Sequence, residues 1–516
     1  MKVLFVIKEI DFADHIAVPY LSAVAKELGW ETNLCILDQT DLMRAVHRER
    51  PDVVAYSANV MSFEALTAAH REAQSEFAFI SIMGGPHPTF SPETFASAGV
   101  DAFCAGEGEL VFRDFLRRIE QGRSFDDVPN LITAKGRNEV RPLVDCLDEL
   151  PFPDRDITLA DTFLKDTPKK TFYATRGCPF SCSYCCNNYY KKLYRGKGRI
   201  ARRFSVERVI REIEFVRDRY RMDFVKFGDD LFAMKADDWL EEFAREYAGR
   251  IGIPFNCYLR LDRVDADLLR LLKQAGCYSV HLSVDSTSEV VREKVLGRRM
   301  RQIDIVETLR LIHSFGINTW VNYMLAAPGS TLADDLGTIA LNKKAHVTYP
   351  AYSTTVPVKG TALYDYSLQR GLIDPDGPIN GLAGCSQIST LRGWSLRERQ
   401  IRYNIFLVGA VIAKLPFPLD WLATQMIKVV PPNRVFVKLR QVYYRYSIEN
   451  RIFNLYRYGR PALVKVKAAV CDRREDPPSA RQPLACRQGI MPLPGRESSH
   501  GRTVERVLCS KENECL

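Results

Sequence analysis

The sequence lacks a long hydrophobic run. The nearest candidate, IFLVGAVIAKLPFPLDWLATQMIKVV, is interrupted by Lys414, two prolines and Asp420, so no stretch reaches the roughly 18 apolar residues that cross a bilayer. The opening residues, MKVLFVIKEI, contain no apolar signal segment with a cleavage site. We therefore expect a cytoplasmic protein that is not integral to a membrane.

The chain also lacks a strong charge excess and an internal repeat. Its 72 basic and 63 acidic residues leave a net charge of +9, which is too mild to indicate a nucleic-acid partner, and none is expected. Fourteen cysteines in a chain of 516 residues without a signal segment favour a reducing compartment over a disulfide framework. The length predicts two or three domains.

The first 140 residues alternate short apolar strands with amphipathic helices. The predicted strands are KVLFVI, TNLCIL, DVVAYS, FAFISIM and DAFC, and one predicted helix runs through Tyr20, Val24 and Leu28 to Gly29. This order predicts an α/β fold with a doubly wound, Rossmann-like parallel sheet, in which ligands bind at the carboxyl ends of the strands.

Residues 141–168, which include DELPFPDRD, are expected to form a linker, and strand-helix units resume over 169–373. The predicted strands lie at 172–175, 223–227, 255–259, 279–284, 318–325 and 353–358, and predicted helices include 206–220, 265–275 and 303–315. Six such units indicate a partial (β/α)6 barrel.

Residues 374–465 change to mostly helical segments rich in aromatic and basic residues, and 466–516 are expected to be a disordered tail. The stretch from Tyr403 to Tyr458 has a composition that suits peripheral contact with an anionic membrane at the inner face. A helical cap that covers the substrate on the barrel explains the same composition equally well. Both interpretations stay open.

The strongest motif is RGCPFSCSYCC, in which Cys178, Cys182 and Cys185 follow a CxxxCxxC spacing directly after a predicted strand. Three thiolates can hold a 4Fe-4S cluster and leave one iron open for another ligand. A structural zinc site with Cys186 as fourth ligand is compatible with the same spacing. The spacing alone leaves both metals possible.

With Tyr184 as the aromatic residue, CxxxCx(aromatic)C on the first strand-loop of a barrel resembles the radical S-adenosylmethionine (SAM) superfamily signature. The resemblance implies that the three cysteines bind a 4Fe-4S cluster. In that superfamily the open iron chelates SAM, and an electron from the cluster cleaves it to methionine and a 5'-deoxyadenosyl radical. That radical removes a hydrogen atom from an unactivated carbon.

The same resemblance places further SAM contacts after later strands. Acidic groups suit the amine and ribose hydroxyls of SAM, and an arginine suits its carboxylate. Asp229 or Asp230 could instead cap the helix that follows, and Arg260 could pair with Asp262 or Asp285. The family commonly has glutamate where an aspartate ends the fourth strand here. These residues are Asp229, Asp230, Arg260, Ser283 and Asp285, and Tyr184 of the cysteine motif is expected to contact the cofactor as well.

The segments PDVVAYS, IMGGPHPTF and AGEGE resemble the cobalamin-binding domain that is fused to many radical SAM enzymes. Such a domain could also be degenerate or bind a nucleotide. The DxHxxG motif that supplies a lower axial histidine is absent, which leaves His15 or no protein ligand below cobalt. The cobalamin contacts that the resemblance implies are Ser57, Gly84, Gly85, His87, Thr89 and Glu107.

From Met1 to about Leu372 the chain is similar to cobalamin-dependent radical SAM enzymes, although AAPGST departs from the usual GLPGET-like segment. We expect a methyltransferase that acts on an unactivated carbon of a small-molecule or lipid-like substrate, with flavodoxin or ferredoxin as electron donor. An oxidative cyclase or rearrangement enzyme, or a corrinoid or iron-sulfur regulator without turnover, are alternatives. An RNA methylthiotransferase is disfavoured, because Cys35, Cys104 and Cys146 form no second triad.

Overall fold

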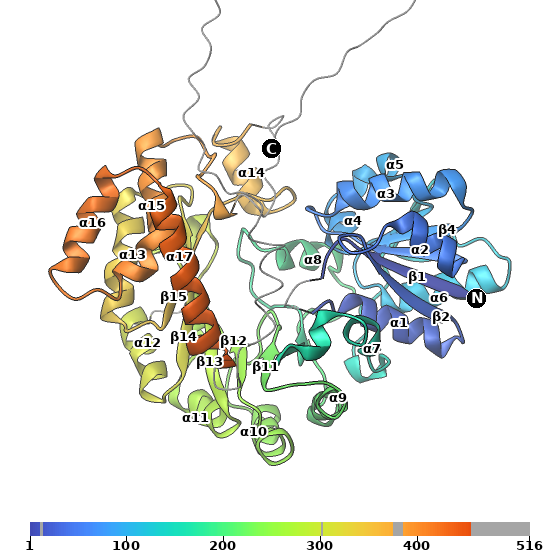
Figure 1. Ribbon diagram of the computed structural model, residues 1–516, viewed down its shortest axis with the longest axis horizontal. Coiled ribbons are helices and arrows are strands. Elements are labelled where there is room, and N and C mark those ends of the chain that lie inside the picture. Colours follow the sequence, from blue (N-terminus) through green and yellow to red (C-terminus); the bar gives the residue numbers. More distant parts are fainter. Residues whose placement is uncertain (11–13, 301–302, 375–384, 456–516) are drawn as a thin grey trace, which may run out of the picture. The chain divides into compact units, whose positions relative to one another are not determined.

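The computed structural model describes residues 1–10, 14–300, 303–374 and 385–455 (Figure 1). The tail expected at 466–516 lies outside the described residues, as does the end of the expected helical region, 456–465. Within the described ranges, no helix is both long enough and apolar enough to cross a membrane.

The N-terminal sheet has seven strands in the order β2-β1-β3-β4-β5-β6-β7. The first five are parallel, and β6 and β7 extend the edge in antiparallel pairing. The predicted doubly wound sheet is confirmed. Its strands are β1 (Lys2–Ile7), β2 (Glu31–Ile36), β3 (Val53–Ser57), β4 (Ile80–Gly84), β5 (Ala102–Cys104), β6 (Leu131–Thr133) and β7 (Gly136–Arg137).

Helices cover both faces of this sheet, as the alternation along β1 requires. Val3 and Phe5 pack in one hydrophobic cluster with residues of α1 (Ala17–Glu27) and α6 (Glu109–Glu120). Leu4 packs on the opposite face with α2 (Leu42–Glu49) and α3 (Phe63–Glu76). Two short helices, α4 (Pro86–Phe90) and α5 (Phe95–Ala98), follow β4.

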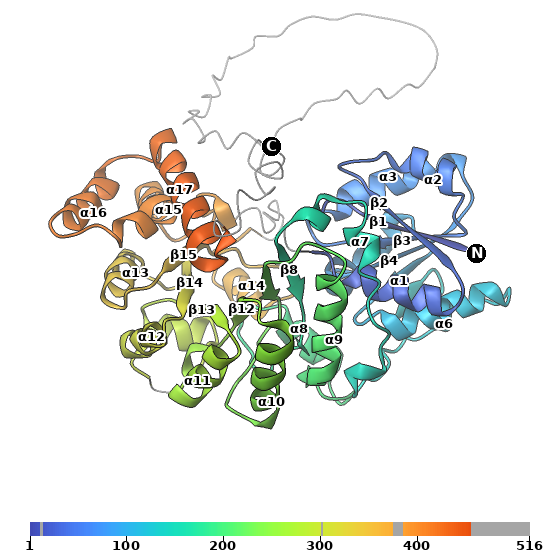
Figure 2. The same ribbon diagram turned by 60° about the horizontal axis from the view of Figure 1, so that its bottom comes forward.

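The second sheet consists of six parallel strands in the order β15-β14-β13-β12-β11-β8. Figure 2 shows helices α9 to α12 side by side along one face of it. The strands are β8 (Lys169–Phe172), β11 (Phe224–Phe227), β12 (Phe255–Tyr258), β13 (Cys277–Asp285), β14 (Asn318–Leu325) and β15 (Tyr349–Thr354). The helices are α9 (Val206–Arg217), α10 (Asp238–Glu246), α11 (Ala266–Gln274), α12 (Ile305–Ser314), α13 (Leu332–Lys344) and α14 (Ala362–Gln369).

The sixth strand was predicted at 353–358, and that position is wrong by four residues. The strand is β15 (Tyr349–Thr354), and it contains Pro350. Proline argues against a central strand because it cannot donate to the ladder. β15 is an edge strand that pairs with β14 alone, so the missing donor is tolerated there.

The segment 141–168, before the second sheet, contains α7 (Asp156–Leu159). The segment predicted to be a plain linker therefore contains a helical turn. After β8 the chain forms β9 (Thr175–Arg176), α8 (Asn187–Leu193) and β10 (Arg202–Arg203), and β9 and β10 pair in antiparallel orientation. The cysteine motif and α8 lie between β9 and β10 in the sequence. The pairing of these two strands therefore brings the start and the end of this segment together.

The C-terminal region is helical, as predicted, with α15 (Leu396–Ile412), α16 (Leu419–Val429), α17 (Arg434–Tyr446) and the turn η8 (Ser447–Ile452). Ile452 and Phe453 form a hydrophobic cluster with Phe224 and Tyr349, which begin strands β11 and β15. The hydroxyl of Ser279 donates to the carbonyl of Ile452 at 2.7 Å. The C-terminal turn thus covers one end of the barrel sheet, at the amino ends of its strands.

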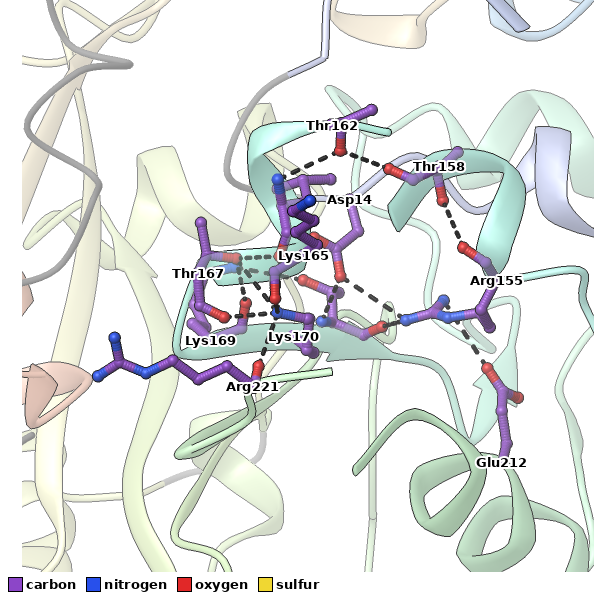
Figure 3. Close-up of polar contacts among 12 residues, drawn as sticks. Asp14, Arg155, Thr158, Thr162, Lys165, Thr167, Lys169, Lys170, Glu212 and Arg221 are labelled. Atoms are coloured by element: carbon purple, nitrogen blue, oxygen red, sulfur yellow. Dashed lines mark hydrogen bonds and ion pairs between the residues drawn. The ribbon is translucent and has the colours of Figure 1, made fainter. Parts of the chain in front are cut away.

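A buried ionic cluster fastens the loop after β1 to the first barrel strand (Figure 3). The Arg155 guanidinium lies 3.6 Å from the Asp14 carboxylate and 3.7 Å from the Glu212 carboxylate. It also donates to the carbonyl of Thr171 at 2.6 Å, and the Thr171 amide donates to Asp14 at 2.7 Å. Beside it, the Lys170 ammonium donates to main-chain carbonyls, among them that of Leu164 at 2.7 Å.

Candidate functional site

The loop between β9 and α8 carries the cysteine motif, and two segments hold it from outside. The Lys191 ammonium donates to the carbonyls of Pro179 and Phe180 at 2.5 and 2.6 Å. The Ser183 amide and hydroxyl donate to the carbonyls of Leu296 and Val295 at 2.8 and 2.7 Å. The loop is therefore fixed by contacts that leave the three thiols of the motif available.

All cysteines of the described residues are free thiols. Cys182 is buried, Cys178 and Cys185 are half-buried, and Cys186 is exposed at the start of α8. A hydrogen bond with the Cys186 thiol lowers the pKa of Cys185 to about 7. Burial raises the pKa of Cys178, which a bound cation would offset.

Three of the predicted SAM contacts form one hydrogen-bonded network at the end of β13. The Tyr184 hydroxyl donates to the Asp285 carboxylate at 2.6 Å, and the Ser283 hydroxyl donates to its other oxygen. Asp285 ends the strand with a φ of 65°, in the left-handed region that non-glycine residues rarely adopt. Such local strain in a sparsely populated conformation is typical of functional positions.

Sequence reasoning missed the cation at the centre of this network. Arg298 lies 3.2 Å from the Asp285 carboxylate, donates to the Tyr184 hydroxyl at 3.2 Å and donates to the Ser283 carbonyl at 2.8 Å. Both charged side chains are almost fully buried. The only sequence signal for this arginine is the basic run VLGRRMR, and the run does not indicate which of its arginines is buried.

Arg260 adopts the pairing that the sequence left as an alternative. Its guanidinium donates to Asp262 at 2.6 Å and stacks on the Phe180 ring, with 3.9 Å to the ring centroid. It also approaches the Cys182 sulfur at 3.9 Å. Arg260 therefore braces the cysteine loop, while its proposed contact with the SAM carboxylate stays a prediction.

The two aspartates after β11 differ sharply in environment. One oxygen of Asp229, which is buried, accepts from the Ala174 and Thr175 amides at 2.9 and 2.5 Å and from the Thr175 hydroxyl at 2.8 Å. Its other oxygen is buried and has no hydrogen-bond partner among the described residues. Asp230 is exposed and faces the cavity described next. Asp230 is thus the better placed of the two for a ligand.

A cavity of about 400 Å³ lies where the carboxyl edge of the N-terminal sheet meets the loops of the barrel. Four predicted cobalamin contacts line it, namely Ser57, Gly84, Gly85 and Glu107, together with Asp230 and Gly228 from the barrel. The volume is in the range of small-molecule sites, about 300–1,000 Å³. The N-terminal sheet and the barrel therefore share one ligand cavity.

The other two predicted cobalamin contacts do not line this cavity. His87 stacks on Phe63 with 3.8 Å between ring centroids and shares a hydrogen bond with Thr94. Thr89 is buried, donates to the Gly85 carbonyl at 2.8 Å and accepts from the Gly106 amide at 3.0 Å. Their positions indicate support of the loops after β4 and β5 more than contact with a ligand.

Arginines of the β9-β10 pair line the same cavity, and sequence reasoning missed them. Arg202 forms an ion pair with Glu107, and Arg176 donates to Glu109 at 2.6 Å. Tyr194, which follows α8, accepts a hydrogen bond from the Glu107 amide at 2.7 Å. All three residues follow the cysteine motif or precede it closely, and only the fold brings them to the N-terminal sheet.

Two family models match this chain. The radical SAM superfamily model covers residues 172–339, and the B12 binding domain model covers residues 12–116. The first range contains the cysteine loop and the Asp285 network, and the second contains much of the cavity edge. The chain is a cobalamin-dependent radical SAM enzyme.

Curated relatives and solved structures agree with this assignment. An uncharacterised methyltransferase of Pyrococcus horikoshii is 26% identical over 374 residues, which are 69% of this chain and 79% of the relative. The hopanoid C-3 methylase of Methylococcus capsulatus is 25% identical over 313 residues, 57% of each chain. The structure of the radical SAM methyltransferase TsrM from Kitasatospora setae, with cobalamin and a 4Fe-4S cluster bound, is similar in fold, with TM-score 0.61, 16% identity and coverage of 86% of this chain and 99% of that one.

The cysteine loop of this radical SAM enzyme fits an iron-sulfur cluster. Its three thiols are free and interact electrostatically with one another. Three thiolates can bind three irons of a 4Fe-4S cluster and leave the fourth iron open. Cys178, Cys182 and Cys185 would hold the cluster.

Two glycines, Gly84 and Gly85, line the cavity edge of this enzyme, where they leave the main chain accessible to a cobalamin. Gly85 has a φ of 104°, and a Cβ there would lie 2.7 Å from the Ala58 carbonyl oxygen. The glycine is thus needed by the turn itself, which keeps the edge open beside Ser57 and Gly84. His15 accepts a hydrogen bond from the Val18 amide at 3.4 Å at the start of α1 and does not line the cavity.

Replacing Gly85 with alanine is expected to destabilise the apoprotein by about 2 kcal/mol and to weaken cobalamin retention at least tenfold. The methyl group collides with the Ala58 main chain and forces the loop to move. Chemical unfolding and the cobalamin absorbance that remains after desalting measure the two effects. Gly84→Ala is the control for stability, because its Cβ comes no closer than 3.8 Å to Cys104. Equal unfolding free energies for both variants would contradict this explanation.

Burial raises the pKa of Asp229 to about 7, which predicts a pH dependence of stability. The folded protein holds this proton more tightly than the unfolded chain, so the unfolding free energy falls as pH rises from about 4 to 7, by roughly 2–4 kcal/mol. Asp229→Asn keeps the acceptor oxygen and removes this titration. In urea unfolding of the apoprotein, the variant should be at least as stable as wild type at pH 8. A difference that does not change between pH 5 and pH 8 would refute the assignment.

Proposed function

We propose that this enzyme transfers a methyl group to an unactivated carbon of a hydrophobic small molecule. When bound, the cluster and SAM supply a 5'-deoxyadenosyl radical, and methylcobalamin supplies the methyl group. The observation that carries the proposal is the shared cavity, which is lined by Gly84 and Gly85 from the N-terminal sheet and by Asp230 from the barrel. The Asp230 carboxylate in turn acts electrostatically on Cys178 and Cys185, so the proposed corrin site adjoins the cysteine loop.

The residues of the Asp285 network would position SAM. The Asp285 carboxylate is oriented by Tyr184 and Arg298, and the Ser283 hydroxyl donates a hydrogen bond to it. An oriented, buried acceptor suits the ribose hydroxyls of SAM, because a held carboxylate needs no rearrangement when the ligand arrives.

Three aromatic side chains on one face of the barrel sheet are consistent with a hydrophobic substrate. Tyr258, His281 and Trp320 lie on three neighbouring strands, with ring centroids 4.2 Å apart for Tyr258 and His281 and 4.3 Å apart for His281 and Trp320. Burial lowers the pKa of His281 to about 3, so its ring is neutral. The three rings give this face of the sheet an apolar surface, and the Lys226 ammonium lies 5.6 Å from the Tyr258 ring centroid at its edge. The hopanoid methylase to which the chain is similar is named for a lipid.

A small acidic electron carrier, flavodoxin or ferredoxin, is the proposed reductant. Residues 188–203, directly after the cysteine motif, contain seven Lys or Arg and no Asp or Glu. A surface cleft of about 1120 Å³ is lined by Pro179 and Phe180 of the cysteine loop and by Arg199, Lys235 and Arg263. Four aspartates also line it, of which Asp237 and Asp262 are paired with arginines. Positive charge beside the loop would steer an anionic partner toward the cluster. The free cysteines of the described residues are consistent with the proposed cytoplasmic location.

The test is anaerobic reconstitution with iron, sulfide and methylcobalamin, followed by SAM with a deuterated methyl group and a reductant. A total lipid extract and an aqueous metabolite extract serve as parallel substrate pools. We expect 5'-deoxyadenosine and a product from the lipid pool that carries the deuterated methyl group. Formation of 5'-deoxyadenosine with a product that lacks the label would favour oxidative cyclisation or rearrangement. No 5'-deoxyadenosine with any pool would favour a regulatory protein.

A further inference from the structure

Exposed apolar side chains concentrate on two C-terminal helices. Seventeen large hydrophobic residues of the described chain are exposed, and ten of them lie between Phe417 and Tyr446. Exposed apolar residues are normally scattered singly over a protein surface. Ten within residues 417–446 are a concentration that scattered exposure does not explain.

Helix α16 carries these residues as one stripe. Leu419, Leu422, Met426 and Val429 follow the spacing i, i+3, i+7 and i+10, and all four are exposed. Two larger side chains lie near the amino end of the same helix, with Phe417 78% and Trp421 55% exposed. The spacing places the stripe along one face of the helix.

Helix α17 repeats the pattern and adds positive charge. Its exposed stripe is Val435, Leu439, Val442 and Tyr446, at i, i+4, i+7 and i+11. A second stripe, one residue earlier in the helix, contains the cations Arg434, Lys438 and Arg445 at i, i+4 and i+11. An apolar stripe thus runs beside a basic one.

Negative charge is almost absent from this part of the surface. Residues 414–446 contain six Lys or Arg and a single acidic residue, Asp420. That carboxylate is already paired with Lys343 of α13. Just beyond α17, the buried Glu449 lies 3.4 Å from the Arg445 guanidinium and offsets its charge. The surface therefore presents apolar groups beside cations, chiefly Arg434 and Lys438 on α17.

We propose that α16 and α17 dock this enzyme on an anionic lipid bilayer. An apolar stripe inserts into the boundary of the acyl chains, and flanking Lys and Arg contact lipid phosphates. A second copy of the chain is a poorer occupant, because a two-fold contact through α17 would bring Lys438 and Arg434 of both copies together. The docking rests on the surface alone. Delivery of a lipid substrate to the barrel also rests on the proposed methyl transfer.

Vesicle flotation of the full chain tests the docking without cofactors or substrate. Phosphatidylcholine vesicles with phosphatidylglycerol are compared with pure phosphatidylcholine vesicles at low and high salt. We expect binding to the anionic vesicles that weakens with salt. Leu422→Glu and Leu439→Glu, one on each helix, should each weaken binding at least tenfold, and Lys438→Ala about fivefold. Circular dichroism and the unfolding midpoint show that the variants fold.

The matched control is Leu396→Glu, an exposed leucine at the start of α15, outside both stripes. It introduces the same charge and should leave vesicle binding unchanged. Three results would overturn the proposal. These are wild-type protein that stays unbound at low salt, binding that Leu422→Glu and Leu439→Glu leave intact, or a dimer that these variants dissociate without any vesicle binding. Because binding is measured without SAM, its failure would leave the methyl-transfer proposal untouched.

Discussion

Cys182→Ala is expected to abolish 5'-deoxyadenosine formation, by at least a factor of about 1,000, in the reconstituted enzyme. Cys182 is the buried member of the triad, and the Arg260 guanidinium lies 3.9 Å from its sulfur. The two remaining thiolates are too few to retain the cluster. The contacts of Lys191 and Ser183 hold the loop itself in place, so they do not replace the lost ligand. Iron content, the visible absorbance of the cluster and chromatographic detection of 5'-deoxyadenosine measure the result.

Two other cysteines separate loss of a ligand from loss of any thiol. Cys146→Ala, in the exposed segment before the barrel, should retain iron and activity. Cys186→Ala should retain iron as well, because only the triad is expected to bind it. If Cys186→Ala loses metal as completely as Cys182→Ala, four cysteines hold it and the zinc alternative returns. Cobalamin absorbance should survive in Cys146→Ala and in Cys186→Ala.

The second large effect is expected for Arg298→Met. Removing one partner of a buried ion pair leaves an uncompensated charge, which costs about 3–5 kcal/mol, and Arg298 is almost fully buried against Asp285. Because Arg298 also holds Tyr184 and the Ser283 carbonyl, SAM affinity should fall by about 100-fold. Urea unfolding and equilibrium dialysis with SAM measure the two losses separately.

A double variant distinguishes a SAM contact from a structural ion pair. The double variant Arg298→Met with Asp285→Asn contains neither charge of this pair. Its unfolding free energy should therefore be at least about 2 kcal/mol higher than that of Arg298→Met alone. SAM affinity should not recover, because the proposed acceptor for ribose is gone. Recovery of both would show that Asp285 only pairs with Arg298. The neighbouring exposed Arg299→Met controls for loss of charge and should change neither quantity.

Much of the fold could be predicted because its strands are buried and its helices have clear ends. β1 (Lys2–Ile7) and β14 (Asn318–Leu325) coincide with their predictions, since apolar runs bounded by polar residues locate a buried strand. The two-residue strands β7, β9 and β10 were missed. A strand that short carries no periodicity, and its partner, not its own residues, defines it.

The site was predictable only as far as local motifs extend. The cysteine spacing, the glycines after β4 and the aspartates after β11 are each readable within a few residues. The partners of these groups are not: Arg202 and Glu107 are 95 residues apart, and Tyr184 and Asp285 are 101 apart. Which of several arginines or carboxylates meet depends on the register of the sheets, and a single sequence does not encode that in any local pattern.

One segment would serve both proposed cofactor sites. The chain leaves the cysteine loop at Cys186, forms α8 and within a few residues places Tyr190 and Tyr194 in the wall of the cavity. If iron ligation rigidifies this segment, a corrin that binds later does not have to do so again. By reciprocity, a bound corrin would then raise the affinity for iron by the same factor. The two prosthetic groups would be thermodynamically coupled ligands, and each apparent dissociation constant would depend on the occupancy of the other site.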